Sequence, residues 1–184
     1  TTCEVTCTAD IQYFADPTDW GDYSDETWEA RLFIMDDTLN EASSTSDGAE
    51  VGSMLAMSVV SGDIAYGALE MGASTTEQTN ASSTIQNTGN IAVDLELEGT
   101  DLVNGASTIP VGNQKFSTSS FTYSACIICG ALSGTASTLE VDLPKATTAE
   151  TPVTDVLYWG IYIPTTGVSG ATHRGQTTFY AVGD

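Results

Sequence analysis

Hydrophobic and polar residues alternate along much of the chain, and this alternation predicts β-strands rather than helices. In residues 91–98 and 139–143, Ile, Val and Leu alternate with Asp and Glu. Successive side chains of a strand point to opposite faces, so each segment offers one face to a core and one to water. The run 155–164 is apolar on both faces and indicates a central strand that ends at Pro164. At the start, the same pattern predicts a strand over residues 2–14, with a buried face formed by Cys3, Val5, Cys7, Ala9, Ile11 and Tyr13.

Turn sequences rich in Gly, Asn, Ser and Asp separate these segments at short intervals. Many short strands with such spacing predict an all-β fold, an Ig-like or jelly-roll β-sandwich of mainly antiparallel strands with little helix. The best helical candidate is one turn around residues 25–29, which Ser24 would cap. The expected strands are 2–14, 27–35, 52–60, 64–70, 81–86, 91–98, 107–110, 115–123, 138–143, 155–163 and 176–182.

The length of 184 residues and a hydrophobic content of 41% are enough for one domain with a sizeable core. Neither an internal repeat nor a proline-rich linker divides the chain, and no stretch has the length and apolarity of a membrane span. We therefore expect a single β-sandwich domain over residues 1–184. Residues 16–50 are expected to form either a long excursion from it or a small lobe.

The net charge is strongly negative, because 4 Lys and Arg residues stand against 25 Asp and Glu residues, which gives −21. Such a surface repels nucleic-acid phosphates and anionic membranes, so nucleic acid is not an expected partner. Scarce Lys together with abundant Thr, Ser, Asp and Gly is typical of an exported protein, and we expect an extracellular or cell-surface location.

The four cysteines form two pairs along the sequence, Cys3 with Cys7 and Cys126 with Cys129. In an extended strand Cys3 and Cys7 would lie about 13 Å apart, whereas a disulfide needs Cα atoms within about 7 Å. This reasoning removes one of the three possible connectivities. Both remaining connectivities tie the first strand to the segment around residue 127. Four thiolates holding zinc are the alternative, but disulfides fit an exported protein better.

The sequence carries none of the common catalytic motifs, and we expect a protein without enzymatic activity. The single histidine, His173, lies in a glycine-flanked loop next to Arg174. An isolated loop histidine is usually solvated, although this pair would suit an anion. The chain contains no nucleophile elbow, zinc-protease signature, phosphate-binding loop or dinucleotide fingerprint. No expected catalytic residue is therefore named.

A cluster of acids and aromatic residues marks the segment 16–29. Several carboxylates in a short loop suit a hard cation such as Ca²⁺, and exposed rings between them would suit stacking on a sugar. The competing interpretation places Trp28 in the core and the acids in solvent. If calcium is a cofactor, the expected ligands are Asp16, Asp19, Asp22, Asp25 and Glu26, and the rings for a glycan are Trp20, Tyr23 and Trp28.

The tripeptide that begins at Asn80 and ends at Ser82 matches the acceptor sequence for N-glycosylation. Such short matches often arise by chance. Asn80 is accordingly only a candidate for modification.

A turn of sequence NTGN within residues 81–102 separates a Ser/Thr-rich strand from an alternating Ile, Val and Leu strand. This stretch resembles the TasA/camelysin-type fibre subunits and the related archaeal bundling pilins. The later stretches FTYSACIICGALSG, LEVDLPKATTAETPVTDVLYWGIYIP and TTFYAV resemble secreted Ig-like surface proteins. The resemblance covers about the last hundred residues. It implies a non-enzymatic sandwich and polymerisation by an N-terminal strand that completes a neighbour's sheet.

A chain with an alternating strand near its start suits strand donation, in which main-chain hydrogen bonds and alternate side chains bind an open sheet edge. We therefore expect a structural protein, the subunit of a filament, pilus or surface array, whose partners are further copies of itself. Cys3 and Cys7 would then form disulfides either within the chain or across subunits. The alternative is a calcium- or carbohydrate-binding adhesion module of a larger surface protein.

Overall fold

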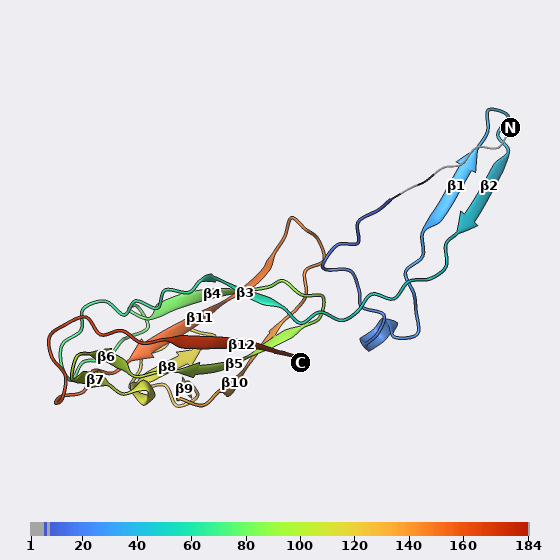
Figure 1. The fold of residues 1–184 in the computed structure, drawn as a ribbon. Helices are drawn as coiled ribbons and strands as arrows, with labels where there is room; N and C mark the ends of the chain where they lie inside the picture. Colours follow the sequence, from blue (N-terminus) through green and yellow to red (C-terminus); the bar gives the residue numbers. More distant parts are fainter. Residues whose placement is uncertain (1–5, 7, 184) are drawn as a thin grey trace.

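The computed structural model describes residue 6 and residues 8–183. It shows two packed β-sheets from which a long arm projects (Figure 1). All strand pairs in the described residues are antiparallel, and the predicted all-β sandwich with little helix is confirmed. The larger sheet has five strands in the order β3 (Met57–Ser61), β4 (Ala81–Asn87), β11 (Val153–Ile161), β8 (Gln114–Ser117) and β9 (Gly130–Ala131).

The smaller sheet has three strands in the order β10 (Ser137–Leu143), β5 (Val93–Gly99) and β12 (Thr177–Gly183). Two separate hairpins accompany the sandwich. One joins β1 (Arg31–Met35) to β2 (Glu41–Thr45), and the other joins β6 (Leu102–Asn104) to β7 (Ser107–Ile109). The helical content described is limited to two 3₁₀ turns, η1 (Gly21–Tyr23) and η2 (Val111–Asn113).

The core lies between the two sheets because the alternating strands turn their apolar faces toward each other. β4 alternates buried and less buried residues along its length, and β11 is buried toward its end. Trp159 is completely buried and packs against Phe116 and Phe179, with ring centroids 5.8 Å away in each case. The aromatic cluster joins strands β11, β8 and β12, and so connects the two sheets.

Most of the predicted strands in the second half of the chain match the structure to within about three residues at each end. The prediction for 64–70 is wrong: Ile64 and Tyr66 pack on the core, but the segment pairs with no described strand. The predicted strand 115–123 ends at Ser117. The helical turn predicted at 25–29 is also wrong. The turn forms at η1, where Gly21 has a φ of +76°, and Ser24 ends this turn rather than starting one.

The strand predicted over residues 2–14 is wrong in its described part. Residues 8–12, called the N-terminal segment below, belong to no strand and are exposed, and Ile11 is 58% exposed. Figure 1 shows this segment leading away from the sandwich toward the β1–β2 hairpin. Alternation defines two faces, but a strand also needs a partner edge, and no described strand of the same chain pairs with the segment. Residues 1–5 and 7 lie outside the described residues.

Residues 19–50 form an arm that is exposed along its whole length and ends in the β1–β2 hairpin (Figure 1). Three hydrogen bonds join its base to the rest of the chain. The Thr18 N–H donates to the Val51 carbonyl at 2.8 Å, and the Val51 N–H donates to Thr18 Oγ1 at 2.9 Å. Asp19 accepts a third bond from the Ser53 N–H at 2.7 Å. Most of the predicted excursion 16–50 lies in this arm. The single domain over residues 1–184 stays a prediction.

Candidate functional site

The described disulfide joins Cys126 to Cys129, whose Cα atoms are 5.6 Å apart. The predicted cross-links from the first strand to this segment are therefore wrong. The chain bends over residues 127–129, and this bend brings the two cysteines together; it follows a turn in which the N–H groups of Ala125 and Cys126 both donate to the carbonyl of Thr122. The distance argument excluded a Cys3–Cys7 disulfide in an extended segment. With it the argument excluded the one connectivity that pairs Cys126 with Cys129. The bonded pair also leaves no four-thiolate zinc site. Cys3 and Cys7 lie outside the described residues.

The acids proposed as calcium ligands do not converge. Asp16 forms an ion pair with Lys145 at 2.5 Å, and Asp19 accepts hydrogen bonds from the N–H and hydroxyl of Ser53. Asp22, Asp25 and Glu26 are exposed. Among the described residues, no three of these carboxylates come within ligand distance of a common point.

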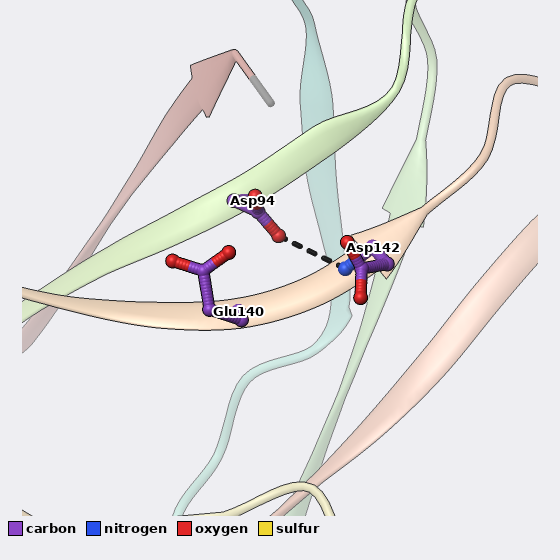
Figure 2. Close-up of side chains that lie close together, drawn as sticks. All are labelled: Asp94, Glu140 and Asp142. Carbon is purple, nitrogen blue, oxygen red and sulfur yellow. Dashed lines mark hydrogen bonds between the residues drawn. The ribbon is translucent and has the colours of Figure 1, made fainter.

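A different set of acids does converge, at the pairing of β5 with β10 (Figure 2). One carboxylate oxygen from each of Asp94, Glu140 and Asp142 lies within 4.8 Å of the others. Asp94 is 5% exposed and accepts hydrogen bonds from the N–H groups of Val141 and Asp142, at 2.8 and 2.9 Å. These bonds hold an irregularity in β10 where the register shifts between Leu139 and Leu143. Sequence reasoning missed this group because all three acids occupy polar positions of alternating strands.

The three arm aromatics are exposed, as a sugar-stacking surface requires. Trp20 is 54% exposed, and Tyr23 and Trp28 are each 43% exposed. The Trp28 Nε1–H donates to the carbonyl of Asp16 at 2.9 Å, which fixes the ring at the base of the arm. The interpretation of Trp28 as a core residue is wrong.

Strand β12 forms an unprotected edge of the three-stranded sheet. All seven of its residues pair in regular register with β5, and no other described strand pairs with it. Phe179 and Ala181 face the core but are only partly buried, because nothing described continues the sheet beside them. The strand contains no charged residue, proline or bulge. Edges of this kind pair readily with further strands.

The opposite edge of the same sheet is protected. β10 carries Glu140 and Asp142, and its pairing with β5 is interrupted by the register shift. Asp142 also has a φ of +45°, which takes the backbone out of the regular strand conformation. Charged residues and bulges are the usual means by which edge strands avoid further pairing. The smaller sheet can therefore grow at β12 more readily than at β10.

A groove of about 1340 Å³ with a mixed polar and apolar lining lies at the end of the sandwich far from the hairpin. Its walls are residues 62–71 and 168–175, and Thr177 at the start of β12 contributes to its lining. Ile64, Leu69, Ile109, Ile161, Ile163 and Val168 supply its apolar surface. Tyr66 donates its hydroxyl to Gln114 Oε1 at 3.0 Å, and burial raises the pKa of this tyrosine.

The β1–β2 hairpin exposes four large apolar side chains of β1. Leu32, Phe33, Ile34 and Met35 are between 38% and 57% exposed. The hairpin turn is ordered by Asp36, whose carboxylate accepts bonds from Thr38 and Asn40. These bonds, those from Asn40 above all, lower the pKa of Asp36 to about 2. The tip of the hairpin is therefore negatively charged at any physiological pH.

The side chains of the two other candidates from the sequence, His173 and Asn80, both form hydrogen bonds. His173 Nε2 lies 2.6 Å from Ser107 Oγ, and its Nδ1 lies 3.0 Å from the carbonyl of Ala171, so the ring is bonded rather than only solvated. Asn80 accepts a bond from the Phe121 N–H through Oδ1, while its Nδ2, the atom that would carry a glycan, is buried. This conformation does not present Asn80 for glycosylation.

No protein-family model matches the chain, and no curated protein or solved structure is significantly similar to it. Within the described residues, no helix is long and apolar enough to cross a membrane.

Proposed function

We propose that this chain is a non-enzymatic extracellular structural protein, the subunit of a filament, pilus or surface array, whose copies assemble by strand addition. In this assembly the N-terminal segment of one copy pairs with the β12 edge of the next. The observation that carries the proposal is that one chain has both an extended segment without a described partner and a regular, uncharged sheet edge without a described neighbour.

The donor segment has the side-chain pattern that strand addition needs. Ala9 and Ile11 alternate with Asp10 and Gln12, so one face can enter a core while the other remains in water, and Tyr13 continues the apolar face in the turn that follows the segment. In the single copy Ile11 and Tyr13 stay exposed, at 58% and 37%. Packing them beside Phe179 and Ala181 would cover apolar surface on both copies.

The directions of the two segments are compatible with antiparallel pairing. β12 runs from the groove end of the sandwich toward the end that bears the arm (Figure 1). The N-terminal segment runs back toward the sandwich from the hairpin side. If the arm of one copy approaches the groove end of another, the donated segment lies antiparallel to β12, the orientation of all described strand pairs. Because donor and acceptor are different surfaces, the contact can repeat from copy to copy, and it gives an open chain where the rotation between copies does not close a ring.

An extracellular location is part of the proposal. The Cys126–Cys129 disulfide and the low Lys and Arg content support it.

Sedimentation velocity and electron microscopy of the concentrated protein test strand addition. We expect the full chain to form multimers at about 0.15 M salt or above, where screening reduces repulsion between copies. The substitution Ile11→Asp should leave monomers, since it places a charge on the buried face of the donated strand. Gln12→Asp adds the same charge on the other face and should assemble like the parent. Equal assembly by both variants would contradict the proposal.

A second candidate function is a calcium- or carbohydrate-binding adhesion module. The convergence of Asp94, Glu140 and Asp142 favours calcium, because hard cations prefer several carboxylate oxygens. The exposed rings of Trp20, Tyr23 and Trp28 favour a glycan.

This candidate predicts that millimolar Ca²⁺ raises the melting temperature and that chelator reverses the rise. The variant Asp142→Asn should lose the response. Asp22→Asn removes an exposed acid of the arm with the same change in net charge, and it should retain the response. A melting temperature that does not change with Ca²⁺ would exclude calcium binding as part of this candidate function.

A further inference from the structure

The β1–β2 hairpin is a two-stranded element whose apolar residues contact no described core. Such a hairpin has little stability of its own in water. Phe33 and Ile34 are 55% and 53% exposed, and their partners across the strand pair are only Ser43 and Ala42. Residues 19–50 contribute no buried residue. An exposed apolar patch of this kind marks a surface that is covered in an assembly.

The groove at the other end of the sandwich has complementary properties. Its lining combines apolar side chains with charged ones, and Thr177 connects it directly to the start of the β12 edge. One of its walls ends in His173 and Arg174. Arg174 is exposed and forms no ion pair with a described residue, although the chain has an excess of acids. An unpaired guanidinium beside a groove that also offers apolar side chains suits a partner with an apolar stem and an acidic end.

The hairpin has this combination of properties. Its tip carries Asp36, which stays ionised because of its lowered pKa, and Asp37 next to it, while β1 supplies the apolar stem. At its base, Arg31 has the opposite charge to Asp63 and Glu70, which line the other wall of the groove. Both signs of charge can therefore be matched by one orientation of the hairpin.

From these observations we propose that the β1–β2 hairpin of one copy docks in the groove of a second copy. The contact rests on the proposed assembly function and identifies a second interface within it. The hairpin and the groove lie at opposite ends of the molecule (Figure 1), so the contact is head-to-tail and continues from copy to copy. Addition of the N-terminal segment, which leads toward the hairpin (Figure 1), to the β12 edge requires the same head-to-tail approach of two copies.

The test uses two full-length variants that damage opposite halves of the contact. Ile34→Asp places a charge on the apolar stem, and Arg174→Glu reverses the charge at the groove. Both residues are exposed, so circular dichroism should show a normal fold. Each variant alone should associate at least about thirtyfold more weakly than the parent in sedimentation equilibrium. Ser24→Asp, which adds the same charge to an exposed position of the arm outside β1 and β2, and Arg174→Lys are the matched controls and should associate like the parent.

Mixing the two variants provides the decisive observation. The Arg174→Glu copy keeps an intact hairpin and the Ile34→Asp copy keeps an intact groove, so an equimolar mixture should form dimers more strongly than either variant alone at the same total concentration. If the parent and both variants associate equally well, the proposed hairpin–groove contact is wrong, whereas strand addition is not contradicted. Variants that weaken association without recovery on mixing would also overturn it. A parent that remains monomeric at high concentration would overturn both proposals.

Discussion

Trp159→Ala should lower the free energy of unfolding by about 3–5 kcal/mol, the usual cost of removing a large aromatic side chain from a core. Trp159 is completely buried and its ring meets Phe116 and Phe179. Its Nε1–H also donates to Ser83 Oγ at 2.9 Å, and Ser83 is itself completely buried. The substitution therefore leaves a cavity between the sheets and a buried hydroxyl without this donor. Chemical denaturation monitored by circular dichroism measures the loss.

Two controls separate the effects of packing and hydrogen bonding. Trp159→Phe keeps an aromatic ring in the core and should cost less than Trp159→Ala. Tyr158→Ala changes the neighbouring residue of β11, which points to the other face and is partly exposed. This control should cost no more than about 1–2 kcal/mol, as is usual for positions outside the core. A loss for Trp159→Ala no larger than that for Tyr158→Ala would contradict the described core.

Asn87→Ala should lower the free energy of unfolding by about 3 kcal/mol or more. Asn87 is completely buried at the end of β4. Its Nδ2 donates to the carbonyls of Ile91 and Leu143, and its Oδ1 accepts from the Gly89 N–H. Alanine leaves two buried backbone groups, and the partly buried carbonyl of Ile91, without this partner, and each buried group costs about 1–3 kcal/mol. The bond to Leu143 also ties the end of β4 to β10, so the loss affects both sheets.

The control for Asn87 is Asn104→Ala. The Asn104 side chain also donates to a backbone carbonyl, that of Thr172 at 2.7 Å, but this bond is exposed. Water can replace it, so the substitution should cost less than about 1 kcal/mol. Equal losses for the two asparagines, measured by the same denaturation experiment, would show that Asn87 does not anchor the turn as described.

The turn at 87–90 shows what local sequence can predict. The NTGN pattern between two alternating segments predicted a turn, and the structure adds the reason for two of its residues. Asn87 bonds across the turn, and a Cβ on Gly89 would lie 2.1 Å from the carbonyl oxygen of Met54, so only glycine fits there without a backbone shift. Alternation identified β5 and β10 for a similar reason, since a sandwich strand repeats its environment every two residues, whereas β11 was identified by a run that is apolar on both faces.

The failures of prediction concern relations between segments that are distant in sequence. The polar sequence of β2, EASST, lacks the large apolar residues that would mark a strand, and it is a strand only through its pairing with β1. The acids Asp94, Glu140 and Asp142 come together only through the register of β5 on β10. The disulfide is a local exception, because a bend over residues 127–129 brings Cys126 and Cys129 together and no residue pattern predicted this bend.

The most direct test of the proposed function is a cryo-electron microscopy structure of the assembled protein. We expect each β12 to be covered by an additional antiparallel strand that belongs to another copy, with Ile11 of that copy packed beside Phe179. The groove of the same subunit should hold the neighbour's β1–β2 hairpin. An assembly in which the β12 edge remains free, or in which only the subunit's own chain covers it, would contradict strand addition between copies.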